Sequence, residues 1–314
     1  MKNFNHMNAE HAVDIFRAAI DCSSKSINCA LAFVIDTEGG AVRRPGACML
    51  ITESGESLGY VSGGCIDADV CAQAVTAIKT DTIKRVRYGL GSKYMDLKLP
   101  CGGAIDILIC PNFDTSALVR IINQIDARRS STLALLPSNT PATTNLFEPL
   151  SFTYYPKLHI RIAGRGYDPR ALARLAISSG INVTLQSPDI EDFEGLGPNI
   201  KTVPLSPKIP EAADDEWTAF CLMFHDTESE TVLLEQALIG PAFYIGAVGS
   251  RRTHQNRRSA LENAGVSEGD IDRIFAPIGL VPSLRDASML AISALAEIIG
   301  EYHRKIDREN TSTS

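Results

Sequence analysis

The second half of the chain alternates short apolar segments with amphipathic helical segments, and this alternation constrains the fold more than any other feature. Apolar runs such as LHIRIAG (158–164) and WTAFCLMFHD (217–226) are separated by helical segments such as PRALARLAISSG (169–180). Strands that are apolar along their whole length are covered on both faces, which is typical of a parallel sheet between two layers of helices. The sequence therefore predicts a Rossmann-like, doubly wound parallel sheet in this half.

The first half predicts a separate, mixed α/β domain. Strand candidates such as INCALAFVID (27–36) and AIDILICP (104–111) accompany a predicted helix, IDADVCAQAVTAIKT (66–80). The periodicity lapses over 138–157, where Pro, Thr and Asn accumulate, as in a linker. With 314 residues, about twice the usual size of one domain, we expect an N-terminal domain over 1–150 and a C-terminal domain over 151–314. We expect the polar tail DRENTSTS to be disordered.

The composition argues against several classes of protein. Lys and Arg number 30 against 37 Asp and Glu, and the resulting net charge of −7 argues against a broad nucleic-acid surface. The N-terminal segment has no apolar signal region, and no run approaches the ~18 apolar residues of a membrane span. We therefore expect a cytoplasmic protein with no membrane or nucleic-acid partner. The eight cysteines include no CxxC pair and are expected to be thiols.

Two segments place a cysteine beside a pair of glycines. SGGCIDADV (62–70) contains Gly63, Gly64 and Cys65, and PCGGAID (100–106) contains Cys101, Gly102 and Gly103. The glycines leave space beside the sulfur, and their backbone N–H groups could lower the pKa of the thiol. The alternative is that both segments are tight turns whose cysteines merely pack. Asp67 and Asp69 suit the first turn of the following helix, where acidic side chains complement the helix dipole.

The segment IRIAGRGYDP resembles the phosphate-binding turn of a nucleotide fold. Gly164 and Gly166 follow a strand and precede a helix, but Pro169 takes the place of the third glycine. An acidic residue usually binds the ribose at the end of the second strand, where this sequence has Ser187, with Asp189 two residues on. The turn is therefore consistent with NAD(P) binding or with a Rossmann domain that has lost or changed its ligand.

A second candidate anion site lies at AVGSRR. Gly249 and Ser250 end a strand, Ser250 can cap the next helix, and Arg251 and Arg252 follow at once. Backbone N–H groups, the positive end of a helix and two guanidinium groups together suit a phosphate or pyrophosphate. The alternative is that both arginines form ion pairs with acidic residues elsewhere. Arg257 and Arg258, two turns on, are expected on a solvated helix face.

Five blocks, taken in their order and spacing, resemble the XdhC/CoxI family of accessory proteins for xanthine dehydrogenase and related molybdenum hydroxylases. They are SGGCIDADV, PCGGAIDILI, IRIAGRGYDP, YIGAVGSRR, and FAPIGL followed by an alanine-rich helix. The resemblance covers roughly residues 40–110 and 157–300. By position, Cys65 and Cys101 match the family's N-terminal cysteines, and the segment from Gly249 to Arg252 matches its C-terminal signature.

The resemblance implies a chaperone rather than an enzyme, with no catalytic residues of its own. Such a protein binds molybdenum cofactor, as molybdopterin or its cytosine dinucleotide form, and protects it while a cysteine desulfurase installs the sulfido ligand. It then inserts the cofactor into an apo molybdenum hydroxylase of the xanthine dehydrogenase or aldehyde oxidoreductase type. The resemblance also implies a homodimer. The candidate cofactor-binding residues, from the motifs and the resemblance together, are Gly63, Gly64, Cys65, Cys101, Gly102, Gly103, Gly164, Gly166, Gly249, Ser250, Arg251 and Arg252.

Soft thiolates suit molybdenum that carries a labile sulfur, so Cys65 and Cys101 are the candidate molybdenum or sulfur contacts. Family members often carry an acidic pair after the second Rossmann strand and an HDH segment in a later strand. Here those places read QSPD (186–189) and FHDTES (224–229), so any nicotinamide or metal role taken from the family stays open.

Two alternatives belong to other functional classes. The first is an NAD(P)-dependent oxidoreductase that uses the Rossmann-like domain. The second is a zinc site built from Cys65, Cys71, Cys101 and His225, whose spacing matches no known finger or catalytic pattern.

Overall fold

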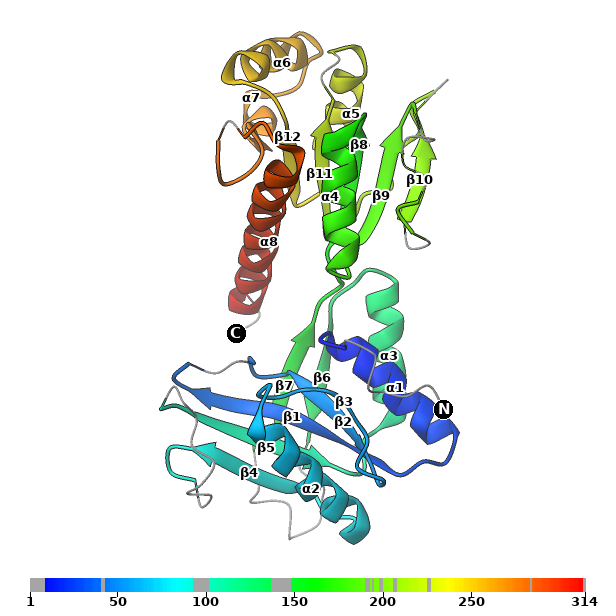
Figure 1. Ribbon diagram of the computed structural model, residues 1–314, viewed down its shortest axis with the longest axis vertical. Helices are drawn as coiled ribbons and strands as arrows, with labels where there is room; N and C mark the ends of the chain where they lie inside the picture. Colours follow the sequence, from blue (N-terminus) through cyan, green and yellow to red (C-terminus); the bar gives the residue numbers. More distant parts are fainter. Residues whose placement is uncertain are drawn as a thin grey trace. The chain divides into compact units, whose positions relative to one another are not determined.

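The computed structural model describes residues 9–40, 43–92, 102–136, 148–189, 193, 195–197, 200–205, 208–224, 227–282 and 284–312. The side chains of Cys65, Thr227, Glu228 and Ser312 also lie outside this description. The chain forms two compact units, Met1–Pro156 and Lys157–Ser314 (Figure 1). Each unit has its own cores and is described by itself.

The N-terminal unit is built on a five-stranded antiparallel sheet with the order β3-β2-β1-β5-β4. Its strands are β1 (Cys29–Glu38), β2 (Cys48–Thr52), β3 (Ser57–Gly59), β4 (Lys84–Gly89) and β5 (Ala104–Cys110). Alternate residues of a strand face opposite sides of a sheet. The central strands β1 and β5 are buried on both sides, because helices cover both faces of this sheet.

The helices of this unit form two separate cores on the two faces of the sheet. α2 (Cys65–Thr80) packs on the face that carries Ala32 and Val34, whereas α1 (Ala12–Ser24) and α3 (Thr115–Asp126) pack on the face of Leu31 and Phe33. A two-stranded sheet of β6 (Ser131–Leu135) and β7 (Leu150–Tyr154) joins the α1 and α3 layer.

The C-terminal unit contains a six-stranded parallel sheet with the order β10-β9-β8-β11-β12-β13, so the predicted Rossmann-like doubly wound sheet is confirmed. Its strands are β8 (His159–Gly164), β9 (Asn182–Ser187), β10 (Ile200–Pro204), β11 (Thr218–Met223), β12 (Tyr244–Ala247) and β13 (Ile274–Phe275). The strand order reverses between β8 and β11, which is where open α/β sheets bind their ligands, at the carboxyl ends of the strands.

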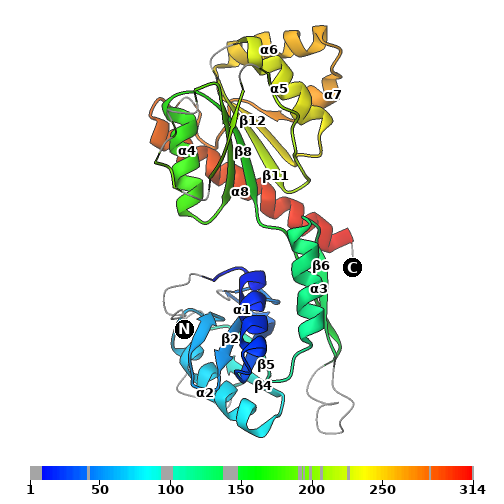
Figure 2. The same ribbon diagram turned by 90° about the vertical axis from the view of Figure 1, so that its right-hand side faces the viewer.

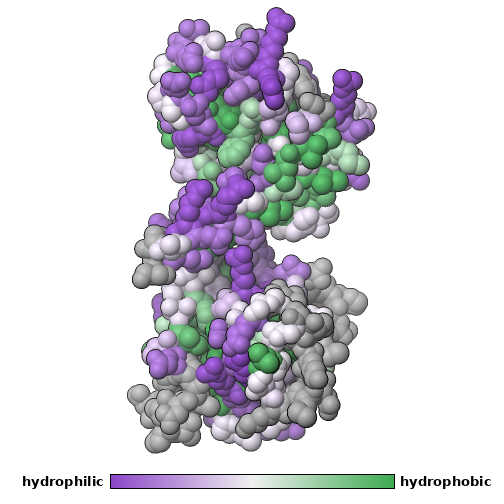
Figure 3. Space-filling model, turned by 90° about the vertical axis from the view of Figure 1, so that its left-hand side faces the viewer, coloured by the Kyte–Doolittle hydropathy of each residue, from purple (hydrophilic) through white to green (hydrophobic). Residues whose placement is uncertain are grey.

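Helices cover both faces of this parallel sheet. α4 (Tyr167–Ser178) and α8 (Ala287–Ser312) pack on one face, and α5 (Thr227–Ile239), α6 (Arg251–Asn263) and α7 (Glu268–Ile271) pack on the other. Figure 2 shows α4 and α5 on opposite sides of the sheet. Figure 3 shows hydrophobic residues on the surface of this unit. Its exposed hydrophobic residues include Leu280, Val281, Met289 and Ile292.

Two expectations from the sequence need correction. Residues 150–154 were predicted as part of the linker, but they form β7, which pairs with β6. The C-terminal tail was predicted to be disordered, but α8 continues to Ser312. Lys305 pairs with Glu309 one turn on and with Glu216, and these contacts hold the polar end of the helix. A helix long and apolar enough to cross a membrane was not found in the described part of the chain.

Candidate functional site

The first Cys/Gly-Gly segment forms a loop folded around the carboxylate of Asp67. Asp67 Oδ1 accepts hydrogen bonds from the N–H groups of Val61 and Ser62 at 3.1 and 2.8 Å. Its Oδ2 accepts from the N–H groups of Gly63 and Gly64 at 2.7 and 3.0 Å. Asp67 therefore occupies the two glycine N–H groups that the sequence offered as groups able to lower the pKa of the Cys65 thiol. The positive φ of Gly63, 73°, allows the loop to converge in this way.

The first turn of α2 lies over the end of the sheet where the second Cys/Gly-Gly segment enters it. Tyr88 on β4 donates its hydroxyl to Asp69 Oδ2 at 2.6 Å. The next residue of β4, Gly89, pairs with Ala104, the first residue of β5. Cys65, one turn before Asp69, and Gly103, directly before Ala104, therefore belong to the same end of the five-stranded sheet.

Gly102 and Gly103 form a close crossing with the end of β1. A Cβ on Gly103 would lie 2.1 Å from the carbonyl oxygen of Glu38, and Gly102 has a φ of 69°. A side chain at position 103 would force the two backbones apart. These glycines therefore fix the position from which the chain enters β5.

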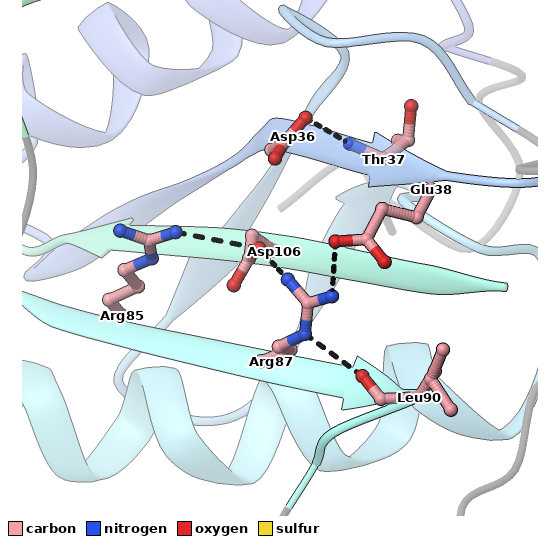
Figure 4. A network of polar contacts seen from close by, with 7 residues as sticks. All are labelled: Asp36, Thr37, Glu38, Arg85, Arg87, Leu90 and Asp106. Atoms are coloured by element: carbon pink, nitrogen blue, oxygen red, sulfur yellow. Dashed lines mark hydrogen bonds and ion pairs between the residues drawn. The ribbon is translucent and has the colours of Figure 1, made fainter.

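A polar network anchors this end of the sheet (Figure 4). Asp106, whose side chain is 3% exposed, pairs with Arg87 at 2.7 Å and with Arg85 at 3.4 Å. Arg87 also pairs with Glu38 at 2.5 Å and donates to the carbonyl of Leu90 at 3.0 Å. Arg87 thus ties β1, β5 and the end of β4 together beside the entry of the second segment.

The sequence analysis did not identify Arg85 and Arg87 as partners of Asp106, although the spacing of the two arginines indicated a shared face of a strand. The segment KRVRYG places them two residues apart on a predicted strand, so that they share one face, and Asp106 lies on the next strand. A buried carboxylate needs such partners, because an unpaired buried charge is costly.

The structure describes the cysteines of the two segments only in part. Cys101 lies outside the described residues, and for Cys65 the backbone is described but the side chain is not. The described cysteines elsewhere are buried, except Cys71, which is partly buried. Burial raises the pKa of Cys29, Cys48 and Cys110 to about 12, so these groups stay protonated at neutral pH.

The glycine turn of the C-terminal unit lies at the carboxyl end of β8. A Cβ on Gly164 would lie 2.6 Å from the carbonyl oxygen of Met223 on β11, so glycine permits the close approach of the two strands. Gly166 has a φ of 82° and open space beside it. Arg165, between them, pairs with Asp189 at 2.7 Å. The acidic residue closest to the expected ribose position is therefore engaged by an arginine of the same turn.

The second anion candidate lies at the carboxyl end of β12. Ser250 caps α6 as predicted, since its Oγ accepts from Thr253 N at 3.1 Å. Arg251 and Arg252 are exposed, and neither forms an ion pair with any residue that the structure describes. β12 is two strands from β8, which separates the two glycine turns by about 10 Å along this edge of the sheet.

Arg257 was predicted on a solvated helix face, and this is wrong. It is 4% exposed and pairs with Glu230 at 3.1 Å, because α6 packs here against α5. Its Nη2 donates to the carbonyl of Val248, two residues before Ser250, and its buried Nη1 has no partner in the described structure. Arg258 stays at the surface and pairs with Asp272.

His254, one turn before Arg258, has a second unsatisfied buried atom, Nδ1. Burial lowers the pKa of His254, and the charges of Arg257 and Arg258 lower it further. The imidazole is therefore neutral at pH 7. Buried polar atoms without partners are rare in native proteins, and two of those found among the described residues lie on α6.

Metal-binding clusters and cavities in the described parts of the chain were compared with these sites. In the parts of the chain that the structure describes, no three His, Cys, Asp or Glu side chains are grouped to hold a metal ion. The proposed zinc set includes Cys101 and His225, which lie outside those parts. A cavity of about 760 Å³ lies between α3 and β6. Cys110 lines it at the far end of β5, so it is remote from Gly103.

Comparison with known proteins shows the family of this chain. Residues 160–298 match the XdhC Rossmann domain, and residues 23–89 match the XdhC and CoxI family. The molybdenum cofactor insertion chaperone PaoD of Escherichia coli is 31% identical over 293 residues, which cover 90% of this chain and 86% of PaoD. The uncharacterized protein YqeB of the same organism is 22% identical over 91% of this chain and 46% of its own length.

A solved structure shares the fold. The crystal structure of a xanthine dehydrogenase from Bacillus halodurans is 20% identical, with a TM-score of 0.72, and the match covers 94% of this chain and 96% of that one. At this identity the match supports the two-unit fold alone.

Proposed function

Because this chain belongs to the XdhC and CoxI family, we propose that it is a chaperone that binds molybdenum cofactor and inserts it into a molybdoenzyme. The observation that carries the proposal is the similarity to PaoD, which extends over nine-tenths of this chain and both of its units. The first turn of α2 and the start of β5 belong to one end of the five-stranded sheet, which supports a site formed by the two Cys/Gly-Gly segments.

Cys65 and Cys101 are the proposed contacts to molybdenum or to its sulfur. Molybdenum with a labile sulfur prefers a soft ligand, and a thiolate is the softest that a protein offers. Cys65 is the first residue of α2, where the positive end of the helix dipole favours an anionic sulfur. Gly102 and Gly103 hold the start of β5 against the end of β1, at the same end of the sheet as the first turn of α2.

The N-terminus of α6 is the proposed phosphate contact of the C-terminal unit. Arg251 and Arg252 carry charge that no described residue neutralises, and Ser250 fixes the start of the helix. The unpartnered Nη1 of Arg257 lies on a guanidinium that contacts the same turn through Val248. These groups suit the phosphate of molybdopterin or the pyrophosphate of its dinucleotide form.

The finer parts of the function remain proposals. We infer that the bound cofactor receives its terminal sulfur from a cysteine desulfurase while it is held here. We infer further that the acceptor is an apo molybdenum hydroxylase of the xanthine dehydrogenase or aldehyde oxidoreductase type, and that the protein acts in the cytoplasm.

Anaerobic titration of the purified protein with intact molybdenum cofactor tests this function. The wild type is expected to bind, and Cys101→Ala and Cys65→Ala are expected to weaken binding at least tenfold, a loss of about 1.4 kcal/mol. Cys71→Ala is the matched control, because Cys71 lies on α2 outside both segments and is partly buried. Arg251→Gln is expected to weaken binding of the dinucleotide form. Unchanged binding by both Cys65 and Cys101 variants would contradict the assigned site.

A further inference from the structure

A groove follows the backbone edge of β6 in the N-terminal unit. The cavity of about 760 Å³ between α3 and β6 is lined by every residue over 131–136. Alternate residues of a strand face opposite sides of its sheet, so a cavity that meets all of these residues lies beside the backbone rather than over one face. Figures 1 and 2 show α3 and β6 side by side. We call this cavity the α3–β6 groove.

The edge of β6 that borders the groove has no strand partner in the described part of the chain. β6 and β7 form a sheet of two strands, and every residue of Ser131–Leu135 pairs with β7 on one side. None of the described β7 residues lines the groove, which therefore lies on the other side of β6. A strand at the edge of a sheet presents a row of backbone N–H and C=O groups that can pair with another chain.

The walls of the groove offer apolar surface. Ile83, Phe113 and Ala117 line it half-buried, and Leu136, just after β6, is 66% exposed. The inner face of β6 and β7 packs on the core of this unit through residues such as Leu133. A further strand beside β6 continues that face, so every second side chain of the added strand points to the same core. Apolar residues at alternate positions therefore fit this groove.

Charges on the rim favour an acidic segment. Arg120 on α3 lines the groove with its side chain 69% exposed. Exposed Arg129, in the turn between α3 and β6, forms no ion pair with any residue that the structure describes. Asp114 is the only carboxylate among the described lining residues, and it accepts from Ser116 N at 2.8 Å and pairs with Arg120 at 3.7 Å. Two arginines thus stand against one carboxylate that is already engaged.

We propose that the α3–β6 groove binds an extended segment of another protein, which adds to β6 as a third strand between β6 and α3. In this mode of recognition, main-chain hydrogen bonds hold the segment and contacts of alternate side chains select it. At about 3.4 Å per residue, the edge of Ser131–Leu135 pairs with a segment of about five residues. The segment carries apolar residues at every second position and an acidic residue beside Arg129.

This interaction is independent of the proposed cofactor site. Cys110 lines the groove at the last position of β5, whereas Gly103 directly precedes the first position of the same strand. The two sites therefore lie at opposite ends of β5. Binding of a peptide and binding of the cofactor can be measured separately on the same protein, so the failure of one proposal leaves the other standing.

Selection of a phage-displayed library of random peptides on the immobilised full chain tests the groove. The enriched peptides are expected to share apolar residues at alternate positions over about five residues, together with an acidic residue. A fluorescent synthetic copy of the most enriched peptide is then titrated with the full chain, and its anisotropy reports binding. A selection that enriches no peptide of this pattern would overturn the proposal.

Variants of the full chain locate the peptide. Ala117→Phe fills the groove and Leu136→Asp removes exposed apolar surface, and each is expected to weaken binding at least about tenfold. Arg129→Glu is expected to weaken it at least about threefold. Arg174→Glu is the matched control, because Arg174 is exposed on α4 in the other unit, and it is expected to leave binding unchanged.

Leu136→Asp keeps this test valid if Ala117→Phe fails to fold, because Leu136 is exposed and its substitution leaves the core intact. Circular dichroism checks the fold of each variant. A peptide that binds folded Leu136→Asp as tightly as the wild type would overturn the assigned groove.

Two N-methylated copies of the peptide test the strand pairing. In an added strand, the N–H groups that donate to β6 belong to alternate residues. Methylation of one alternate set is expected to weaken binding at least about tenfold, and methylation of the other set by less than about threefold. Equal effects of the two sets would overturn addition as a strand.

Discussion

At the scale of single residues, the loop before α2 shows how one side chain can organise a site. Asp67 was expected to complement the helix dipole, yet its carboxylate collects four backbone N–H groups of the preceding loop. The sequence identified the acidic residue and the glycines but not their contact, because the contact depends on a loop conformation that only the positive φ of Gly63 permits. Burial of Arg257 was missed for a similar reason, since its partner Glu230 comes from another helix.

Asp67→Asn is expected to destabilise the N-terminal unit. The amide retains one acceptor oxygen and loses the charge, so the four hydrogen bonds weaken and the free energy of unfolding falls by about 2 kcal/mol. Urea denaturation measures this difference. Asp21→Asn is the control, because Asp21 forms a surface pair with Lys25 and should change stability by less than about 0.5 kcal/mol. Equal effects of the two substitutions would contradict the role given to Asp67.

The buried thiol of Cys48 makes stability depend on pH. Burial raises the pKa of this thiol to about 12, whereas the pKa of a cysteine in the unfolded chain is about 8.5. The folded state therefore keeps the proton while the unfolded state loses it. The contribution of this thiol to stability is complete below about pH 8.5 and falls as the pH rises towards 12.

Cys48→Ala removes this titration. Between about pH 8 and 10, the free energy of unfolding of the wild type is expected to fall by about 2 kcal/mol more than that of the variant. Urea denaturation at a series of pH values measures the two slopes. Parallel slopes would show that this thiol ionises equally in both states.

At the scale of helices and strands, the sequence predicted most of the elements because their burial follows simple periods. β5 and β11 are buried at every position, and their apolar runs in the sequence predicted both strands. β7 was missed because its burial is partial and its sequence, LSFTY, lies in a segment rich in Pro and Thr. The end of α8 was missed because ion pairs, rather than apolar packing, support it.

The turn into α6 depends on glycine at position 249. Its φ is 133°, and an added Cβ would lie 3.0 Å from the side chain of Thr253, so Gly249→Ala is expected to cost about 2 kcal/mol. Gly269→Ala is the control, because Gly269 lies on α7 in an ordinary conformation with open space beside it. It should be neutral or stabilising by up to about 1 kcal/mol. Urea denaturation measures the free energy of unfolding of both variants. An unchanged value for Gly249→Ala would contradict the requirement for glycine in this turn.

At the scale of the whole molecule, the division of the chain into two units separates two groups of candidate residues. The N-terminal unit holds both Cys/Gly-Gly segments, and the C-terminal unit holds both glycine turns and the exposed arginines. The sequence indicated these candidate segments because glycines and cysteines mark them. It could not show which of them converge, because Tyr88, Asp106 and Arg87 bring them together through pairings between distant strands.

The molybdenum and pterin content of the protein, purified without oxygen from cells that make the cofactor, tests the chaperone function most directly. The wild type is expected to carry pterin and molybdenum in equal amounts, and the Cys65→Ala Cys101→Ala double variant is expected to carry neither while keeping the wild-type circular dichroism spectrum. A wild type that carries no pterin, or a folded double variant that carries as much as the wild type, would contradict the account.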